Sequence, residues 1–453
     1  SIPPSYVLRM YARSIEATHG SSYRGGRGID ASFKFRIRSD LLEHSLHFRS
    51  KNRPRMRRLH EQIHQRIRNG DHEASVAYDQ EYERSEEEVI QESRIIITTC
   101  SSACSHGAIY QRVGSTSVRR VRFATVIIDE AAQATEPDIV LPSLLADDRV
   151  VLVGDHKQLG PVVRESNLCR EYLNALETPM LERLDRSPDA MLPRTMLETQ
   201  YRMHGSIRNF PSTRFYDARL KDDEGIQVAR PPLAIWPVVG DHVVFVDCAH
   251  PHKFASVLNI GYGKSRAREL EESSTSLLNK GEAKVIASAC RRLLSKAQCA
   301  PNQIAVLTPY RAQQEEIQKT LRTACGNVAG DDIAVGTVYS LQGSERDYIL
   351  ISFVRSVTEV SSIMAADKHA SAAGDITVKG KADEATRQMC ETHLGIVSNA
   401  KLLNVSLTRA RCGLVIVGNH RVLSDGSEDF LELTKQLRQR RCLITEEEFS
   451  KLG

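Results

Sequence analysis

Short runs of branched apolar residues recur along the chain and predict the strands of a parallel sheet. They lie at 123–128 (FATVII), 150–153 (VVLV), 304–307 (IAVL), 348–353 (YILISF) and 413–417 (GLVIV). The runs lack polar alternation and are separated by longer helical patterns, which is typical of strands buried on both faces of an α/β sheet. Because ligands bind at the carboxyl ends of such strands, we expect the chemistry in the residues that follow each run.

Two stretches of the chain depart from this pattern. Residues from about 41 to 92 are highly charged and predict long helices; within them, 49–68 carries eight Lys or Arg against Glu61 alone, and 79–88 is strongly acidic. The basic run is either a solvated helix face or a surface that contacts a phosphate backbone. Residues from about 357 to 393 lack large apolar side chains and predict a surface insertion.

Composition narrows the class of protein. The chain has 453 residues, of which 41% are hydrophobic and 26% charged, which excludes a wholly disordered protein. The net charge of +4 is too small to indicate nucleic-acid binding by itself. We expect a soluble protein without a membrane anchor, since no apolar stretch approaches the roughly 18 residues that cross a bilayer.

Two of the predicted strands end in polar groups suited to phosphate chemistry. Asp129 and Glu130 follow the first run in VIIDEAAQATE, and adjacent carboxylates can hold Mg²⁺ and orient or deprotonate an attacking water. The alternative is that the pair caps the next helix. Gln158, in VLVGDHKQLGPVV, is a neutral amide that can sense a γ-phosphate, whereas Asp155 either holds the turn or acts in catalysis.

Six ordered segments resemble the motifs, from the second onwards, of superfamily 1 helicases. Their spelling is closest to the Upf-type and senataxin-type branch, and the likeness covers nearly the whole chain except 357–393. The segments are DEAAQATEP, GDHKQLGPVV, ETQYRMH, VLTPYRAQ, VGTVYSLQGSERDYILISFVRS and LNVSLTRARCGLVIVGN.

The resemblance implies an α/β fold with two RecA-like domains that have parallel sheets. The first is expected at 1–192, with the charged helical insertion at about 41–92, and the second at 193–453. The implied function is ATP-dependent movement on a single strand, RNA in preference to DNA, with ATP and Mg²⁺ as cofactors. The implied partners are other proteins of an RNP or decay complex, and the implied location is the cytoplasm, with the nucleus and organelles left open.

The resemblance also implies roles for individual residues. For catalysis they are Asp129 as the Mg²⁺ ligand, Glu130 as the base, Gln158 as the γ-phosphate sensor, and Arg202 and Arg409 as phosphate-contacting arginines. For the nucleotide they are Tyr201, Gly343 and Glu345, and for nucleic acid Thr99, Thr308 and Tyr310. Tyr201 could instead be a core aromatic, and Glu345 could pair locally with Arg346. Asn279 and Glu282 either act near the cleft or cap and pack a helix.

One expected motif is missing from the chain. The sequence contains no Gly-x-x-x-x-Gly-Lys-Ser/Thr, the loop whose amides and lysine hold the β- and γ-phosphates. The first residue is Ser, and the later catalytic motifs are present, which favours truncation with the loop on an upstream segment. The alternative is a catalytically inactive, helicase-like scaffold for RNA binding or assembly.

Overall fold

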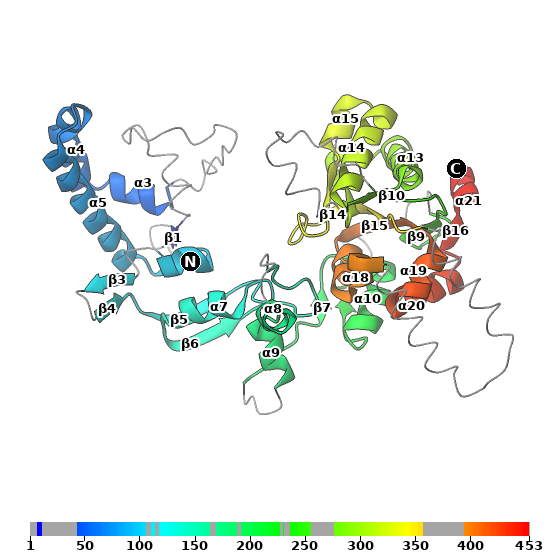
Figure 1. Cartoon of the computed structure of the whole chain (residues 1–453), viewed down its shortest axis with the longest axis horizontal. Helices are drawn as coiled ribbons and strands as arrows, with labels where there is room; N and C mark the ends of the chain where they lie inside the picture. Colours follow the sequence, from blue (N-terminus) through cyan, green and yellow to red (C-terminus); the bar gives the residue numbers. More distant parts are fainter. Residues whose placement is uncertain are drawn as a thin grey trace. The chain divides into compact units, whose positions relative to one another are not determined.

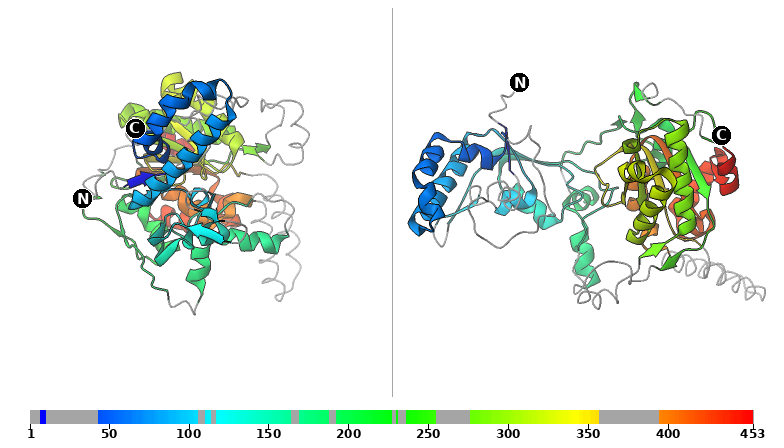
Figure 2. Two further views of the ribbon diagram at one scale, coloured as in Figure 1. Left: turned by 90° about the vertical axis from the view of Figure 1, so that its left-hand side faces the viewer. Right: turned by 90° about the horizontal axis from the view of Figure 1, so that it is seen from above.

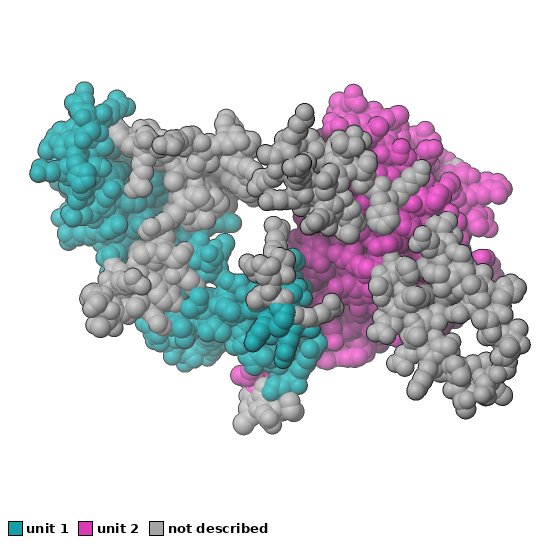
Figure 3. Space-filling view, viewed as in Figure 1, with its two compact units in different colours: residues 1–156, 160–190 teal, residues 157–159, 191–453 magenta. Residues whose placement is uncertain are grey.

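The chain divides into two compact units. The computed structural model describes residues 7–10, 43–105, 110–113, 117–163, 169–187, 192–226, 230, 236–254, 276–356 and 394–452. The insertion predicted at 357–393 lies outside the described residues. Unit 1 comprises residues 1–156 and 160–190, and unit 2 comprises residues 157–159 and 191–453 (Figure 3). The backbone therefore enters unit 2 at Lys157–Leu159, returns to unit 1, and enters unit 2 again after residue 190.

A six-stranded sheet forms the centre of unit 2. Its strands, in spatial order, are β13 (Ala334–Thr337), β12 (Ile304–Thr308), β14 (Arg346–Ser352), β15 (Ala410–Gly418), β9 (Val243–Asp247) and β16 (Leu443–Thr445). Every pairing between these neighbours is parallel, so all six carboxyl ends lie along one edge.

The central strands of this sheet are buried on both faces. Along β9, Val243 and Phe245 pack into one apolar cluster, whereas Val244 and Val246 pack into another, and β12, β14 and β15 alternate in the same way. The first cluster includes residues of α10 (Gly205–Phe215), α18 (Ala400–Leu407), α19 (His420–Gly426) and α20 (Glu428–Gln439), and the second those of α13 (Lys280–Lys296) and α14 (Arg311–Cys325). Helices thus cover both faces, and the predicted α/β class with parallel sheets is confirmed (Figures 1 and 2).

Unit 1 contains further parallel strand pairs. β1 (Val7–Arg9) pairs with β2 (Ile95–Ile97), and β5 (Phe123–Ile128) pairs with β6 (Ala146–Leu152); β3 (Tyr110–Val113) and β4 (Ser117–Arg120) form an antiparallel hairpin. The helices around these strands are α6 (Cys100–Ser105), α7 (Glu136–Ser143), α8 (Arg170–Glu177) and α9 (Met180–Arg186). Ile97, Ile127 and Val150 are 50%, 67% and 41% exposed, although such residues are normally buried in parallel sheets.

The predicted helical insertion is confirmed. It consists of α3 (Leu46–Lys51), α4 (Pro54–Arg68) and α5 (His72–Glu92), drawn in blue in Figure 1. Pro54 occupies the first turn of α4, where its missing N–H costs nothing, and the side chain of Asp71 caps α5 by accepting a hydrogen bond from Ala74 N. Met56 and Ile63 on α4 are buried.

Charge complementarity joins the basic and acidic helices of this insertion. The ion pairs are Arg53–Glu88 at 3.3 Å, Arg53–Glu92 at 2.5 Å and Arg55–Glu81 at 3.3 Å. Part of the basic charge is therefore paired within unit 1. Among the described residues, Arg57 and Arg58 contact only neutral groups, the Asn52 side chain and the Pro54 carbonyl. These two arginines leave the phosphate-binding interpretation of the basic run open.

A buried polar network lies at the start of α13, beside the carboxyl ends of β12 and β14. Glu282 is fully buried, and its Oε2 accepts hydrogen bonds from Ser352 Oγ at 2.7 Å and from Val354 N at 2.8 Å. Asn279 caps α13 by accepting a hydrogen bond from Glu282 N at 3.1 Å, and Gln313 Nε2 donates to Asn279 O and Ser352 Oγ. Of the two alternatives for Asn279 and Glu282, the structure shows capping and packing.

This network predicts how the stability of unit 2 depends on pH. Burial raises the pKa of Glu282 to about 8, above its ordinary 4.5. Between these values the folded chain holds a proton that the unfolded chain releases, so the free energy of unfolding falls as pH rises from about 4.5 to about 8. Glu282→Gln should remove this contribution to the slope, whereas Glu315→Gln on the exposed face of α14 should keep it. Urea denaturation at pH 5 and pH 8 measures both, and equal slopes for the two variants would contradict the assignment.

Candidate functional site

The two predicted catalytic carboxylates of unit 1 lie in an exposed turn after β5. Ile128 ends the strand, Asp129 and Glu130 are exposed, and Glu130 adopts a left-handed φ of 52° that non-glycine residues rarely take. Asp129 Oδ1 accepts a hydrogen bond from Glu130 N at 2.9 Å, and Gln133 Nε2 donates to Glu130 Oε2 at 2.6 Å. The next helix, α7, begins six residues after Glu130 with Thr135 at its N-cap. The pair therefore does not cap α7, and the capping alternative is wrong.

The loop that follows β6 packs tightly against this turn. Val153 N donates to Ile128 O at 2.9 Å, and Ala131 N donates to Val153 O at 2.8 Å. A Cβ on Gly154 would lie 3.0 Å from the backbone nitrogens of both Ala131 and Ala132, so only glycine fits without a shift. The position of Asp129 and Glu130 thus depends on contact between the ends of β5 and β6.

The segment Lys157–Leu159 carries the predicted phosphate sensor into unit 2. Leu159 is buried in the larger apolar cluster there, and Asn404 Nδ2 donates to Lys157 O at 2.9 Å. Gln158 Oε1 accepts a hydrogen bond from Nη2 of Arg409 at 3.1 Å. Two residues separated by 251 positions in the sequence, both predicted to act on phosphate, are therefore in direct contact.

Arg409 is linked in turn to Arg202. The Arg409 side chain is almost fully buried and also donates to Val405 O and to Thr408 Oγ1. Arg202 Nη1 donates to Thr408 O at 3.2 Å, so Thr408 lies between the two guanidinium groups. Arg202 Nε donates to Glu345 Oε2 at 2.5 Å. Glu345 therefore pairs with Arg202, and the Arg346 side chain donates to the Glu345 carbonyl and not to its carboxylate, which corrects the local-pair alternative.

Positive charge dominates around Glu345. Burial raises the pKa of this carboxyl, but the hydrogen bond from Arg202 and the charges of Arg202, Arg411 and Arg230 hold it below its usual range. Arg411 Nε lies 3.7 Å from Glu345 Oε1 and its Nη1 3.6 Å from Asp347 Oδ1. Arg230 and Arg411 were not predicted from the sequence. Arg411 could have been found, because it lies two residues after Arg409 in the LTRAR segment. Arg230 lies outside all of the recognised motifs, so the sequence gives no indication of its role.

Tyr201 and Gly343 are both accessible. Tyr201 is 67% exposed, which excludes the core-aromatic alternative, and its carbonyl accepts a hydrogen bond from Arg230 Nη2 at 3.1 Å. Gly343 has φ of 77°, and a Cβ there would meet no atom within 4 Å. The turn at Gly343 therefore needs glycine for its backbone conformation rather than for space.

Of the three residues predicted to contact nucleic acid, Thr308 and Tyr310 are buried and Thr99 is exposed. Thr308 is fully buried at the end of β12, and Tyr310 is 8% exposed, with its hydroxyl accepting a hydrogen bond from Arg355 Nε at 2.9 Å. Both side chains are buried, and their contact with nucleic acid stays a prediction. Thr99 is exposed and accepts a hydrogen bond from Ser102 N at the start of α6, and its contact with nucleic acid stays a prediction.

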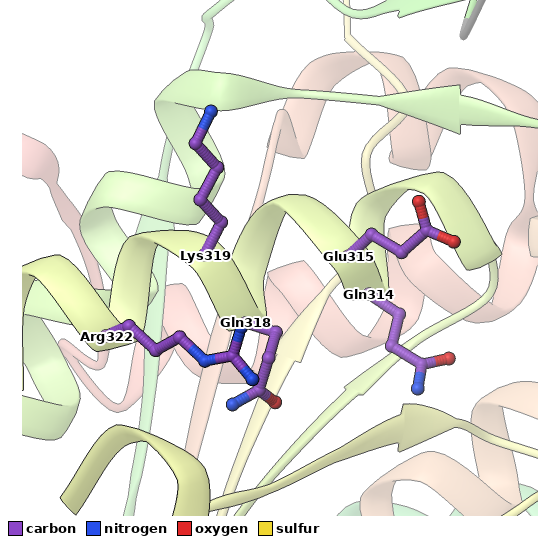
Figure 4. A pocket seen from close by; sticks show the side chains of 5 residues that line it. All are labelled: Gln314, Glu315, Gln318, Lys319 and Arg322. Carbon is purple, nitrogen blue, oxygen red and sulfur yellow. The ribbon is translucent and has the colours of Figure 1, made fainter. Parts of the chain in front are cut away.

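A polar hollow lies on the surface of α14, and most of the side chains that line it hold neighbouring elements in place. Figure 4 shows its lining of five side chains from this helix: Gln314, Glu315, Gln318, Lys319 and Arg322. Three of the five hold neighbouring elements: Gln314 donates to Val335 O, Gln318 to Gly330 O and Arg322 to Asp331 Oδ1. The hollow contains none of the predicted site residues.

The close approach at Gly154 gives a testable prediction. Gly154→Ala should lower the free energy of unfolding of unit 1 by about 1–3 kcal/mol, because the new methyl group overlaps backbone that cannot move alone. Gly160→Ala is the matched control, since its Cβ would meet its nearest atom at 3.4 Å. Urea denaturation followed by circular dichroism compares the two variants. Equal stabilities would show that the two turns are not in contact.

Comparison with known proteins agrees with the motifs. Two family models, each described as an AAA domain, match the chain. One matches residues 176–421, which is more than half of the chain, and the other matches residues 15–166.

Among the described residues, no helix has the length and apolar character needed to cross a membrane.

Curated relatives point to one branch of helicases. The chain is 30% identical to the regulator of nonsense transcripts 1 homolog of Neurospora crassa, over 80% of this chain and 27% of that protein. It is 31% identical to the homolog of that name in Arabidopsis thaliana (80% and 24%), and 28% identical to the ATP-dependent helicase upf1 of Schizosaccharomyces pombe (90% and 38%). The chain thus spans about a quarter to two fifths of the length of these relatives. The chain belongs to the AAA-domain family, within the Upf-type branch of the superfamily 1 helicases.

Proposed function

We propose that the chain is the motor region of an ATP-dependent helicase or translocase that acts on single-stranded nucleic acid. The observation that carries the proposal is the hydrogen-bonded set of Gln158, Arg409, Thr408 and Arg202 in unit 2. Guanidinium groups stay charged at all physiological pH values and bind phosphate oxygens in a planar fork. A neutral amide beside them can distinguish a bound γ-phosphate from an empty site without repelling it.

The residues of unit 1 would supply the hydrolytic chemistry. Asp129 and Glu130 offer exposed carboxylate oxygens, the donors that Mg²⁺ prefers. Asp129 would hold the ion, which neutralises charge on the phosphates when bound with ATP. Glu130 would orient and deprotonate the attacking water, and Gln133 holds its carboxylate in place at 2.6 Å. Arg202 and Arg409 would stabilise the charge that develops on the transferred phosphoryl group.

Three further residues would bind the rest of the nucleotide. The exposed ring of Tyr201 is suited to stack on a base, and Gly343 lets the backbone approach closely. Glu345 is an acceptor for ribose hydroxyls. Because Glu345 also holds Arg202 at 2.5 Å, a bound nucleotide would compete with it for that arginine.

The nucleotide site also needs a phosphate-binding loop, which this sequence does not contain. We infer that a further segment with Gly-x-x-x-x-Gly-Lys-Ser/Thr packs on unit 1. The exposed apolar residues Ile97, Ile127 and Val150 support this inference, since another strand or helix would bury them.

The relatives favour RNA as the strand. Two of them are named regulators of nonsense transcripts, and transcripts are RNA. By the same likeness, the partners would be proteins of an RNA-decay complex, and the location would be the cytoplasm.

Replacement of the proposed base tests the catalytic assignment. In a polypeptide that joins this chain to a P-loop segment, Glu130→Gln should cut ATP turnover by at least about a hundredfold. ATP binding should change little, because glutamine has nearly the same shape. Glu171→Gln, an equal change of charge on the exposed side of α8, is the control. Near-normal turnover in Glu130→Gln would show that Glu130 is not the catalytic base.

Charge reversal tests the basic helix. If Arg57 and Arg58 contact phosphates, reversing both to Glu should weaken binding of single-stranded RNA. The dependence of log K on log salt should also become shallower by about 0.7 for each lost contact. Reversal of Lys435 and Arg438 on α20 makes the same change in net charge and is the control. Equal effects of the two double variants would show that the basic run is a solvated helix face and not a phosphate-binding surface.

A further inference from the structure

The carboxyl ends of β9 and β16 place three potential metal ligands together. The two strands pair in parallel, and their last pair is Asp247 with Thr445, so Cys248 and Glu446 are the next residues of adjacent strands. His250 follows Cys248 by two positions, and residues two apart in extended backbone project to the same side. Ligand atoms of the three side chains lie within 4.8 Å of one another. Among the described residues, this is the one such group of His, Cys, Asp or Glu.

The backbone around the group holds these residues in place. Asn279 Nδ2 donates to the His250 carbonyl at 2.8 Å. The imidazole packs over the first turn of α13, where a Cβ on Gly281 would lie 2.1 Å from His250 Cγ, so the ring position requires glycine there. Glu446 begins α21 (Glu446–Lys451), whose N-terminus is fixed by the reciprocal capping of Thr445 and Glu448. Contacts with α13 therefore hold His250, and the capped start of α21 holds Glu446.

The accessibility of the three side chains suits a metal at the edge of the sheet. Cys248 is fully buried, whereas the side chains of His250 and Glu446 are each 48% exposed. His250 Nε2 already lies 2.9 Å from Glu446 Oε2. In a tetrahedral site with bonds of about 2.0–2.3 Å, ligand atoms are about 3.3–3.8 Å apart, so small rotations of the two half-exposed side chains are enough. The fourth position would face solvent.

We propose that Cys248, His250 and Glu446 bind a divalent transition metal of the zinc type. Sulfur, imidazole nitrogen and carboxylate oxygen together match the donors that Zn²⁺ takes in proteins, and Ca²⁺ or Mg²⁺ would not choose a thiolate. The metal would join α21 to the end of β9, next to the place where Arg292 already donates to the Phe449 and Ser450 carbonyls.

Proton release accompanies this binding. Burial, together with the charges of Glu282 and Glu446, raises the pKa of the Cys248 thiol, so the metal must displace a proton from sulfur. The carboxylates that disfavour a bare thiolate also attract a divalent cation. Without a metal, the group is a surface His–Glu pair beside a buried thiol, which contributes little to stability.

Cobalt titration of the full chain tests the proposal. One equivalent of Co²⁺ should produce a thiolate-to-cobalt charge-transfer band together with tetrahedral visible bands, and Zn²⁺ should remove both. The band should be absent in Cys248→Ser, and His250→Gln and Glu446→Gln should each weaken Co²⁺ binding more than about tenfold. Cys442→Ser, another buried thiol of unit 2, and Glu447→Gln, the neighbour of Glu446, are controls that should bind normally.

Three results would each overturn the site. The first is the absence of a stoichiometric band in the unaltered chain, and the second is a band that survives in Cys248→Ser. If Cys248→Ser does not fold, Glu446→Gln decides the question, because its side chain is half-exposed and its loss leaves the core intact. Unchanged Co²⁺ affinity in that variant would also overturn the proposal.

Discussion

Burial of the central strands on both faces is the constraint on which the chemistry of unit 2 depends. With apolar layers on either side of β9, β12, β14 and β15, polar side chains are confined to the strand ends and to the loops beyond them. The buried network around Glu282 and the Cys248 group lie at the carboxyl edge, and Glu345 and Arg409 lie just before β14 and β15. Thr308, the last residue of β12, is still fully buried between the two helical layers.

Hydrogen bonding accounts for the burial of a charged group beside the proposed phosphate site. Placing a guanidinium such as that of Arg409 out of water is costly unless its N–H groups find acceptors. Here the acceptors include Gln158 Oε1, Thr408 Oγ1 and the Val405 carbonyl, which are neutral. Neutral acceptors satisfy the donors without cancelling the charge, so the positive field that a phosphate would need is retained. Arg202, by contrast, is held by the carboxylate of Glu345.

The sequence predicted the parts of the structure that depend on local pattern. All five apolar runs lie largely within strands, and α3, α4 and α5 occupy most of the charged stretch at 41–92. The domain division after residue 192 stays a prediction. Three strands of the six-stranded sheet were missed. β9 has an apolar run like the others, but β13 contains Gly336, and β16 has only three residues, too few for a periodic signal. The ion pair of Arg411 with Glu345, the hydrogen bond of Arg230 to Tyr201, and the register that joins Cys248 to Glu446 arise from tertiary pairing, which local sequence spacing does not reveal.

The most direct test of the central claim is the rate of ATP hydrolysis, with and without single-stranded RNA, by a polypeptide that joins this chain to a P-loop segment. We expect Mg²⁺-dependent hydrolysis that RNA stimulates, because the chain contains all five proposed catalytic residues: Asp129, Glu130, Gln158, Arg202 and Arg409. RNA binding that is indifferent to ATP, together with no hydrolysis, would contradict it and leave the chain as an RNA-binding or assembly scaffold.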